Sequence, residues 1–499
     1  MTLRELLPRL QRPVVAGPTD VEVVGVSADS RTAGPGSVFV AIRGNEVDGR
    51  RFIPTAVGNG AVAVVCDTAP ETGDPTVPWV QVADTRAALS ALAAALADDP
   101  SSKLKLIGVT GTNGKTTTAY LCHHIMQRLW HRAGLLGTVL MDDGEEAVSA
   151  THTTPGPVAL QELVARMVGN GCRGAALEVS SHGIDQKRVA DLAFDAQVFT
   201  NLTQDHLDYH GTMEAYAAAK ISWFQRAAED PKGKKPVAVI NIDDASGAEL
   251  AEMLDGRMRI TRYGFGVHAD FRVTDFRQSP RGMEFKLHAA HKQFLVRAPL
   301  IGRFNVYNIV AALAASRAVG IQPREAVSAI ADAPQVPGRL ENCGTRDGVT
   351  VFVDYAHTPD ALENVCRTLK ELEPKRLITV FGCGGDRDRG KRPLMARAAA
   401  RHSDVCIITS DNPRSEDPEA IIREVEAGMG GARYRSVTDR SEAIRIAVHA
   451  AGEGDIVLVA GKGHEPYQQF ADKTIDFDDR KEARRALRER APSDKPDRR

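Results

Sequence analysis

Residues Thr110–Thr117 read TGTNGKTT, a segment that could bind the phosphates of a nucleotide. The segment follows an apolar run, LKLIGV, and precedes a stretch with helical spacing. Glycines let backbone N–H groups surround a phosphate, Lys115 can reach the terminal phosphates, and the Thr116 hydroxyl can bind Mg²⁺. The strict pattern GxxxxGKS/T would need glycine at Val109, so this loop is a variant. A glycine-rich turn that caps a helix is the structural alternative, but the flanking strand and helix favour nucleotide binding.

Six further polar clusters each follow an apolar run of strand length. They are EVSSHG (178–183), TNLTQDHLDYH (200–210), DYAHTPD (354–360), GCGGDRDRGKR (382–392), SDNPRSEDP (410–418) and GKGHE (461–465). In open α/β sheets, ligands bind beyond the carboxyl ends of the strands. Because the clusters come from two predicted domains, we expect a cleft between those domains to hold the site.

The length and two polar, proline-containing breaks predict three domains. At about 150 residues per domain, 499 residues favour three. The breaks are Asp98–Ser102 and Ala333–Gly338. We therefore expect a domain over residues 1–99, a central domain over 100–335 and a C-terminal domain over 336–499.

Continuous apolar runs alternating with helical patterns predict an α/β fold. The expected strands of the first domain are Val21–Val26, Val38–Ile42, Ala61–Cys66 and Trp79–Val82, followed by a helix near Ala88–Ala97. The later runs are LKLIGV, AALEV, DAQVFT and PVAVINID, then VTVFVDYA, RLITVFG, DVCIITSDN and DIVLVAGKG. Such runs are typical of parallel sheets covered on both faces. We predict a small N-terminal α/β domain, a central doubly wound parallel sheet with a phosphate loop and a C-terminal Rossmann-like α/β domain.

The composition excludes several classes of protein. A hydrophobic content of 43% with 26% charged residues is ordinary for a globular chain. The net charge of −2 gives no global positive field for nucleic acid. The seven cysteines lack zinc-binding spacing, so most are expected in the core as reduced thiols. No run has the length of a signal peptide or membrane helix, which predicts a cytoplasmic protein, and the last twenty residues predict a short helix and a frayed tail.

Five motifs in this order resemble the Mur ligases. The motifs are TGTNGKTT, EVSSHG, NLTQDHLDYHG, DYAHTPDAL and FGCGGDRDRGKRP, and the resemblance spans nearly the whole chain. It implies ATP-dependent formation of an amide bond by way of an acyl phosphate. The closest likeness is to members that add meso-diaminopimelate to UDP-N-acetylmuramoyl-L-alanyl-D-glutamate. The implied partners are these small molecules, without nucleic acid or membrane, and a monomer is expected.

The reaction implied by this resemblance needs cations around the transferring phosphoryl group. Glu178 and His206 both follow predicted strands and could bind Mg²⁺ or Mn²⁺, although each alone would more often be a polar loop residue. Lys220 lies in MEAYAAAK, where a lysine is normally solvated. The resemblance assigns Lys220 a carbamate, derived from CO₂, that helps to hold the second of two Mg²⁺ ions. The expected metal ligands are therefore Thr116, Glu178, His206 and carbamylated Lys220.

The resemblance also assigns residues to the nucleotide and the UDP-linked substrate. For ATP they are Gly111, Thr112, Asn113, Gly114, Lys115, Thr116, Thr117, Asn305, Asn308, Arg339 and Asp354. For the UDP-linked dipeptide they are Ala28, Ser30, Asn45, Glu46, Val47, His152, Thr153, Thr154, Ser180, Gln186 and Arg188. Helix caps and turns are the structural alternatives for these Ser, Thr and Asn residues. Lys115, Glu178, His206 and Lys220 are the expected catalytic residues.

Asp411-Asn412-Pro413-Arg414 is the segment that informs the choice of amino acid. Asp-Asn-Pro is a common turn, but Arg414 adds a planar fork that can bind a carboxylate bidentately. Diaminopimelate has a distal carboxylate that lysine lacks, and DNPR matches the motif of the diaminopimelate-adding relatives. By resemblance, Arg387, Gly461 and Glu465 complete this pocket, with Glu465 pairing with an ammonium.

Two other functions compete with this interpretation. Folylpolyglutamate synthetase has a related phosphate loop and carbamylated lysine, but it lacks the N-terminal UDP-binding domain and DNPR. A P-loop NTPase switch would hydrolyse nucleotide without ligation, and phosphate release that depends on an amino acid would distinguish the two.

Overall fold

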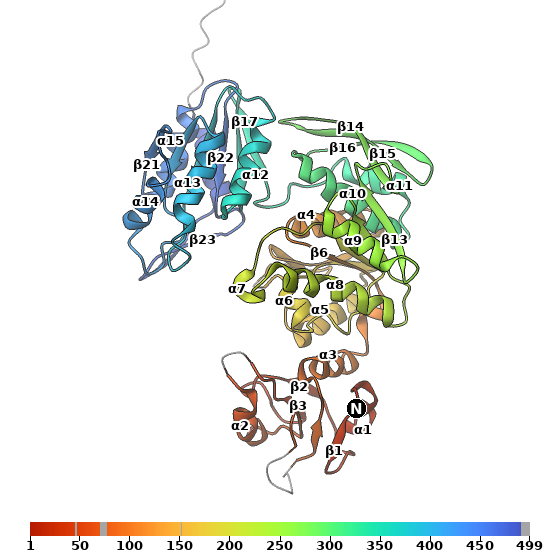
Figure 1. Ribbon diagram of the computed structural model, residues 1–499. Helices are drawn as coiled ribbons and strands as arrows, with labels where there is room; N and C mark the ends of the chain where they lie inside the picture. The colour runs from red at the N-terminus through yellow and green to blue at the C-terminus, as the bar shows by residue number, and fades with distance from the viewer. Residues whose placement is uncertain (45–46, 70–76, 151, 491–499) are drawn as a thin grey trace, which may run out of the picture. The chain divides into compact units, whose positions relative to one another are not determined.

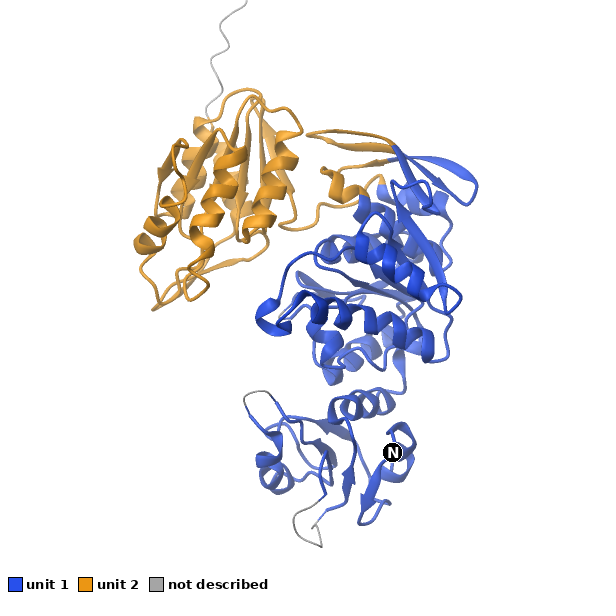
Figure 2. Cartoon of the chain, viewed as in Figure 1, with its two compact units in different colours: residues 1–274, 286–296, 307–330 blue, residues 275–285, 297–306, 331–499 orange. Residues whose placement is uncertain are grey.

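The computed structural model describes residues 1–44, 47–69, 77–150 and 152–490 of the chain. The chain divides into two compact units, which Figure 2 distinguishes by colour. Unit 1 comprises residues 1–274, 286–296 and 307–330, and unit 2 comprises residues 275–285, 297–306 and 331–499. The predicted boundary near residue 99 lies inside unit 1, and the three predicted domain ranges stay predictions. No helix among the described residues is long and apolar enough to cross a membrane.

The first hundred residues contain a five-stranded sheet (Figure 1). Its elements are α1 (Leu3–Leu6), η1 (Leu7–Arg9), β1 (Val14–Ala16), β2 (Gly25–Ser27), β3 (Ser37–Val40), η2 (Gly49–Phe52), α2 (Ile53–Gly58), β4 (Ala63–Cys66), β5 (Trp79–Gln81), α3 (Thr85–Leu96) and η3 (Pro100–Lys103). The strand order is β1-β5-β4-β3-β2, with β1 antiparallel to β5 and the other neighbours parallel. Val38 packs in a core cluster with Leu92 of α3, whereas Phe39 packs in a second cluster with Ala56 of α2. Both faces of the sheet are therefore covered, which explains its continuous apolar strands.

The next part of the chain forms an eleven-stranded sheet. Its strands are β6 (Lys105–Thr110), β7 (Ala133–Leu136), β8 (Leu140–Asp142), β9 (Ala147–Ser149), β10 (Gly174–Glu178), β11 (Ala196–Phe199), β12 (Val237–Asn241), β13 (Arg259–Gly264), β14 (Phe271–Ser279), β15 (Gly282–Ala289) and β16 (Lys292–Ala298). The spatial order is β16-β15-β14-β13-β12-β11-β6-β10-β7-β8-β9. The strands from β13 to β7 in this order pair parallel, and β8 and β9 extend the sheet antiparallel.

The helices of this region are α4 (Lys115–Trp130), α5 (Pro157–Gly169), α6 (Ser181–Asp185), α7 (Leu207–His210), α8 (Met213–Glu229), α9 (Ala245–Leu254), α10 (Arg303–Ala318) and α11 (Pro323–Ile330). α5, α8 and α9 bury apolar side chains in one cluster with Leu106 of β6, whereas α4 packs against β6, β7 and β10 (Figure 1). β10 lies on one side of β6 and β11 on the other. The carboxyl end of β6 is therefore a topological switch point, where ligands bind in such sheets.

Unit 2 contains a six-stranded sheet and a two-stranded sheet. Their elements are β17 (Glu341–Arg346), β18 (Val349–Asp354), α12 (Pro359–Lys370), β19 (Leu377–Phe381), α13 (Lys391–His402), β20 (Val405–Ile408), α14 (Pro418–Glu426), β21 (Tyr434–Ser436), α15 (Arg440–Ala450), β22 (Ile456–Ala460), β23 (Tyr467–Gln469), β24 (Thr474–Asp476) and α16 (Asp479–Glu489). The order of the large sheet is β17-β18-β22-β19-β20-β21, parallel except for β17. One face packs against α12, α13 and α14 and the other against α15 and α16. β23 pairs antiparallel with β24.

Most predicted strands agree with these elements. The strand predicted over Val21–Val26 is wrong at its start: β2 covers Gly25–Ser27, because the Val23 N–H donates to the Met1 carbonyl at 2.7 Å and not to a neighbouring strand. The four runs of the central domain are β6, β10, β11 and β12, and the four C-terminal runs are β18, β19, β20 and β22. The helix predicted near Ala88–Ala97 begins earlier, at Thr85, because the Asp84 carboxylate accepts a hydrogen bond from the Ala87 N–H. All seven cysteines are buried and free, as expected. The predicted terminal helix is α16, and the predicted tail at 491–499 lies outside the described residues.

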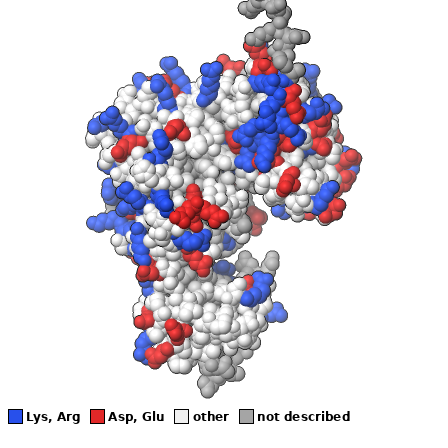
Figure 3. Space-filling model, turned by 180° about the vertical axis from the view of Figure 1, so that it is seen from behind, with Lys and Arg blue, Asp and Glu red and all other residues white. Residues whose placement is uncertain are grey.

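Charged side chains of both signs are interspersed over the face of the molecule in Figure 3. The basic helix α16 illustrates this mixing. Arg480 lies 2.6 Å from Asp478, Arg484 lies 2.6 Å from Glu341, and Arg485 pairs with Glu482. These pairings oppose the use of this helix as a surface for a nucleic acid backbone.

Candidate active site

The loop after β6 is shaped by two glycines and closed by Lys115. Gly111 has φ +145°, and a Cβ there would lie 1.9 Å from the Thr200 hydroxyl oxygen, so only glycine fits. Gly114 has φ +85° and directly precedes α4. The Lys115 Nζ donates to the carbonyl oxygens of Gly111 at 2.9 Å and Thr112 at 2.8 Å. The lysine therefore lies over the loop at the N-terminus of a helix, where phosphate binds favourably.

The loop that follows β11 forms hydrogen bonds with the phosphate loop. The Asn113 N–H donates to Asn201 Oδ1 at 2.9 Å, and the Thr200 hydroxyl donates to the Asn113 carbonyl at 2.6 Å. The Thr112 hydroxyl accepts from the Thr203 N–H at 2.9 Å and lies 3.2 Å from Tyr216 Oη. These bonds fix the conformation of the loop without any ligand.

Glu178, the last residue of β10, lies beside the first turn of α4. The Thr116 hydroxyl donates to Glu178 Oε2 at 2.9 Å. Glu178 also accepts from the Thr138 N–H at 2.6 Å and the Thr138 hydroxyl at 3.1 Å. Its side chain is only 1% exposed, so the fold has brought together two predicted metal ligands from separate motifs.

Lys220 is buried, in contrast to the solvated position that its helical segment favours. It is 1% exposed, and its Nζ donates to the Gly111 carbonyl at 2.9 Å and lies 4.6 Å from the centre of the Tyr216 ring. Burial lowers the pKa of Lys220 well below its ordinary value, and the nearby Lys115 lowers it further. An amine in this environment is readily deprotonated.

His206 directly precedes α7 and has a left-handed backbone, φ 52°. Its Nε2 lies 3.4 Å from the Asp205 carboxylate, and its ring centre lies 5.0 Å from that of His182. Burial lowers the pKa of His206, which favours the neutral imidazole that binds metals. Within the described residues, no three His, Cys, Asp or Glu side chains converge closely enough to hold a metal ion. Metal binding by the four expected ligands therefore stays a prediction.

The residues predicted to bind the dipeptide form a connected group around the end of β10. The Thr154 hydroxyl donates to the Glu178 carbonyl at 2.9 Å and accepts from the Ser180 N–H at 3.1 Å. The Thr153 hydroxyl lies 3.0 Å from that of Thr138. Arg188 donates to the Thr154 carbonyl at 2.6 Å. The group therefore extends from the Glu178 carboxylate toward α6.

A pocket of about 270 Å³ lies beside this group. His152, Gln186 and Arg188 line it together with Ile42 and Arg86 of the N-terminal part. The Arg188 guanidinium donates to Gln186 Oε1 at 2.6 Å, which fixes both side chains. The pocket thus brings three predicted residues into contact with the region predicted to bind UDP.

The N-terminal residues predicted for the uridine are only partly described. Ala28 is exposed, Ser30 is buried, and the Val47 side chain is 48% exposed. Asn45 and Glu46 lie outside the described residues. Contact of these residues with uridine stays a prediction.

Of the residues predicted for the nucleoside, Asn308 lies closest to the phosphate loop. Its Oδ1 accepts from the Thr118 hydroxyl at 3.4 Å, and a Cβ on Gly114 would lie 2.3 Å from it. Asn305 donates to the Ile301 carbonyl at 2.8 Å. Thr117 is buried on α4. Contact of either asparagine with adenine stays a prediction.

In unit 2, Asp354 ends β18 and organises the following turn. Its two carboxylate oxygens accept from the N–H groups of Leu340 at 2.6 Å and Ala356 at 2.8 Å. Burial raises the pKa of Asp354, and Arg339 opposes that shift. The Arg339 guanidinium lies 4.8 Å from the centre of the Tyr355 ring. Arg339 and Asp354 are thus close together, as the predicted ribose or phosphate contact requires.

Asn412 is the centre of the DNPR cluster. Its Nδ2 donates to Glu465 Oε2 at 3.0 Å, and its Oδ1 accepts from Lys462 Nζ at 3.0 Å. Lys462 Nζ also lies 3.1 Å from Glu465 Oε2 and is fully buried. Glu465 therefore already has a cationic partner within the protein, and its contact with a substrate ammonium stays a prediction.

Arg414 follows with a left-handed backbone, φ 53°, and is partly buried. Its Nη1 donates to the Gly385 carbonyl at 2.8 Å, and its binding of a carboxylate stays a prediction. The side chain of Arg387 is exposed and donates to the Asp386 carbonyl at 3.0 Å. Gly461 has φ +123°, and a Cβ there would lie 2.6 Å from Asp411 Oδ2. Pro413 is buried between these groups.

Arg440 fixes the two strand ends that carry this cluster, a role that the sequence interpretation missed. Arg440 and Asp479 form a fully buried pair with a separation of 2.7 Å. Arg440 also donates to the carbonyls of Ser410 at 3.3 Å and Ala460 at 3.0 Å, directly before Asp411 and Gly461. Thr138 and Lys462 were missed as well. Lys462 lies inside the quoted GKGHE motif, whereas nothing near Thr138 marks its contact with Glu178.

Three family models match most of the chain. They are described as "Mur ligase family, catalytic domain" over residues 22–96, "Mur ligase middle domain" over 109–316 and "Mur ligase, glutamate ligase domain" over 338–463.

Curated and solved relatives resemble the chain over its whole length. A protein of Geobacillus thermodenitrificans named "UDP-N-acetylmuramoyl-L-alanyl-D-glutamate--2,6-diaminopimelate ligase" is 44% identical over 98% of this chain and 100% of its own length. A solved structure with the same name in its title is 36% identical, with a TM-score of 0.73 and coverage of 98% of this chain and 99% of the other. Folylpolyglutamate synthase of Mycobacterium tuberculosis is 21% identical over 76% of this chain, with a TM-score of 0.59, and shares the fold.

Proposed function

The chain belongs to the Mur ligase family, and from this premise we propose that it adds meso-diaminopimelate to UDP-N-acetylmuramoyl-L-alanyl-D-glutamate at the expense of ATP. The product would be the tripeptide precursor of peptidoglycan. The dipeptide's terminal carboxylate would first take the γ-phosphoryl group of ATP. The amine of diaminopimelate would then displace phosphate from the acyl phosphate and form the amide.

One observation carries the chemical part of this proposal. The Thr116–Glu178 hydrogen bond places a buried carboxylate beside a phosphate loop at the switch point of the sheet. A buried carboxylate at this position suits a cation bound to nucleotide phosphates. The 44% identity to a diaminopimelate ligase over the full chain supports the choice of substrates.

The residues around the phosphate loop fit the proposed Mg²⁺ ions. Thr116 and Glu178 would hold one ion, and His206 and a carbamate on Lys220 would help to hold a second, with Mn²⁺ as an alternative. The burial of Lys220 fits this modification, because a neutral amine can attack CO₂, form an N–C bond and release a proton. When bound, the ions would neutralise charge on the phosphates.

The protein groups would then orient the reactants. Lys115 already lies over the loop and would turn its ammonium toward the terminal phosphates. The backbone N–H groups of Thr112 to Lys115, at the N-terminus of α4, would bind phosphate oxygens. Thr153, Ser180 and Arg188 would hold the dipeptide near Glu178, so that its carboxylate faces the transferred phosphoryl group.

The DNPR cluster would select the amino acid. Arg414 would bind the distal carboxylate of diaminopimelate bidentately, and Glu465 would bind its ammonium. Asp411, Asn412, Pro413 and Gly461 would shape the pocket, and Arg387 would cover it. Lys462 would hold Glu465 in place and keep its charge balanced.

An ADP-release assay tests the proposal. Purified protein, ATP and Mg²⁺ would be incubated with the UDP-linked dipeptide plus diaminopimelate, lysine or no amino acid. We expect rapid ADP release only with diaminopimelate, together with a product heavier by one diaminopimelate residue. Equal rates with lysine would refute the proposed selectivity, and ADP release independent of both substrates would indicate a nucleotide hydrolase.

The alternatives receive less support. Folylpolyglutamate synthase shares only the fold at 21% identity, and a family model for the N-terminal part matches residues 22–96 of this chain. A regulatory NTPase would have no use for the DNPR cluster. We further propose that the protein works as a monomer in the cytoplasm, which sedimentation and cell fractionation would test.

A further inference from the structure

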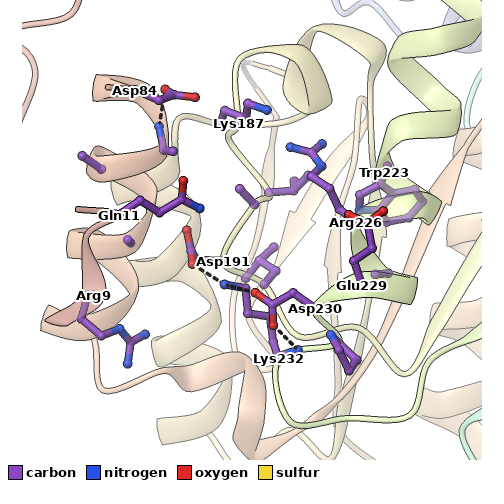
Figure 4. Close-up of a pocket in the computed structure, with 18 of the residues that line it drawn as sticks. Arg9, Gln11, Asp84, Lys187, Asp191, Trp223, Arg226, Glu229, Asp230 and Lys232 are labelled. Atoms are coloured by element: carbon purple, nitrogen blue, oxygen red, sulfur yellow. Dashed lines mark hydrogen bonds and ion pairs between the residues drawn. The ribbon is translucent and has the colours of Figure 1, made fainter. Parts of the chain in front are cut away.

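A pocket of about 360 Å³ in unit 1 has no role in the proposed reaction (Figure 4). It lies between α3 and η1 on one side and, on the other, residues 187–197 and the C-terminal end of α8. None of the residues assigned above to a substrate or metal lines it. Its size falls in the range of small-molecule sites.

The base of the pocket is apolar and firmly packed. Phe194 and Trp223 line it and contact each other edge to face, with ring centres 5.1 Å apart. Trp223 lies against β6, because a Cβ on Gly108 would lie 2.6 Å from its ring. Ala88 and Ala91 of α3 line the opposite wall. These side chains therefore form an apolar surface against which a flat, apolar part of a ligand can pack.

Most of the charges around the pocket already have partners. Arg9 binds Asp99 through two hydrogen bonds, at 2.8 and 2.5 Å. Lys232 lies 3.1 Å from Asp191 and 2.9 Å from Asp230. Glu229 lies 3.2 Å from Arg257, outside the pocket. These groups do not require a ligand.

Lys187 and Arg226 are different. Arg226 Nη2 is buried and has no hydrogen-bond partner in the described part of the chain. Burial lowers the pKa of both side chains, and Arg226 lowers that of Lys187 further. Asp84 and Asp185 act on both cations and Asp191 acts on Arg226, but each of these carboxylates already has another partner: the Ala87 N–H, the Tyr209 hydroxyl and Lys232. None of them gives Arg226 Nη2 a hydrogen bond.

A second buried polar atom at the pocket also lacks a partner. Gln197 lines the pocket and is 1% exposed, and its Oε1 accepts no hydrogen bond from a described residue. Native proteins satisfy nearly all such atoms with protein, water or ligand. The unpartnered Arg226 Nη2 therefore points to a hydrogen-bond acceptor in this pocket, whereas the Gln197 oxygen needs a donor, which water or a hydroxyl group of the ligand can supply.

We propose that the pocket binds a small organic anion, with its carboxylate or phosphate group at Lys187 and Arg226 and its apolar body against Phe194 and Trp223. Figure 4 shows the ends of Lys187 and Arg226 directed toward the same region of the pocket. An anion there would give Arg226 Nη2 the hydrogen-bond acceptor that no described residue supplies. Arg226 would bind it by charge-assisted hydrogen bonds, and the aromatic base would exclude ions without an apolar part.

Titration calorimetry and Trp223 fluorescence on the full chain test this site. The chain has three tryptophans, so Trp79→Phe with Trp130→Phe leaves Trp223 as the single reporter. The probes are benzoate, phenyl phosphate and neutral benzamide at constant ionic strength. Benzoate and phenyl phosphate separate a carboxylate ligand from a phosphate ligand. Calorimetry on the unmodified chain gives the answer independently of the tryptophan variants.

We expect saturable binding of at least one anion, a change in Trp223 emission and no binding of benzamide. Arg226→Gln and Lys187→Gln should each weaken binding about tenfold. The matched controls Arg281→Gln and Lys292→Gln remove exposed charges elsewhere and should leave binding unchanged. The proposal is wrong if neither anion binds, if benzamide binds equally well, or if both pocket variants bind like the parent. Since Lys187 is only partly buried, its variant remains informative if Arg226→Gln does not fold.

Discussion

The phosphate loop and the DNPR segment both follow parallel strands, but different interactions hold them. Position 111 accepts only glycine, because a Cβ there would clash with the Thr200 hydroxyl. Glu178 and Lys220 are each 1% exposed. In the DNPR cluster, side chains hold one another: Asn412 joins Lys462 to Glu465, whose side chain is 20% exposed. Under the proposed function, the fold itself would fix the reactive centre, whereas a set of mutually bonded side chains would fix the choice of amino acid. Changes in the first region should abolish chemistry, and changes in the second should alter selection.

The largest effect is expected from Lys115→Ala. Loss of its charge on the terminal phosphates should lower the ligation rate about 10³-fold or more, as expected for a strong electrostatic contact in the transition state. ADP release and circular dichroism would be measured on the same sample. Lys235→Ala, at an exposed position, is the matched control. Near-normal turnover in a folded Lys115→Ala protein would refute the phosphate-loop assignment.

Substitution of Lys220 should lower the ligation rate almost as much as Lys115→Ala does. A positive charge at position 220 should not be enough for activity. Lys220→Ala is expected to lose about 10²-fold or more in rate, because the second ion would lose an anionic ligand. Lys220→Arg should be equally poor, since it keeps a positive charge and cannot form the carbamate. Formate or acetate should partly restore the alanine variant by occupying the vacated space. An active arginine variant would show that Lys220 acts through packing or positive charge.

Arg414→Ala should distinguish the role of the DNPR cluster from that of the phosphate loop. A charge-assisted hydrogen bond contributes about 1.5–3 kcal/mol, and its loss together with an unpaired substrate carboxylate should lower kcat/KM for diaminopimelate about a hundredfold. The KM values for ATP and the UDP-linked dipeptide should change little. Lysine should not become a good substrate, because removing an attraction does not create a pocket for its neutral end. Wild-type efficiency with diaminopimelate would contradict the role of DNPR.

Asn412→Ala should have the smallest effect of these four. It removes the amide between Lys462 and Glu465 but leaves their direct contact of 3.1 Å. We expect the KM for diaminopimelate to rise about tenfold while kcat stays within about twofold, because the hydrogen bonds of the Asn412 side chain with Glu465, Lys462 and the Gln469 N–H would be lost. Asn364→Ala on α12 provides a control in the same unit. A fall in kcat with unchanged KM would place Asn412 in the chemical step instead.

The sequence predicts the parallel strands well and the edges of the sheets poorly. Runs such as LKLIGV are apolar throughout because both faces are covered, and this signal is local. β15 has a different signal: Met283, Phe285, Leu287 and Ala289 are buried in alternation along the strand. That period of two lies among polar residues and was not recognised. The short strands β1, β8 and β9 have three residues each and carry no periodicity.

The sequence predicts a candidate site residue where that residue lies in a motif of known chemistry. It does not predict one whose environment comes only from tertiary packing. TGTNGKTT gave the phosphate loop from its glycines and lysine. The alanine-rich segment around Lys220 predicts a surface lysine, and only the packing of α8 beneath Gly111 buries the ammonium. Arg440 likewise lies in an ordinary helix start, DRSEA, and its contacts with Ser410, Ala460 and Asp479 come from distant parts of the chain.

The central claim is that unit 1 performs the phosphoryl transfer and that DNPR acts only afterwards. Positional isotope exchange in γ-labelled ATP, with the UDP-linked dipeptide and no amino acid, measures reversible acyl-phosphate formation directly. The account predicts exchange at similar rates in the parent protein and in Arg414→Ala, and none above background in Lys115→Ala. Loss of exchange in Arg414→Ala, or its persistence in Lys115→Ala, would contradict the account.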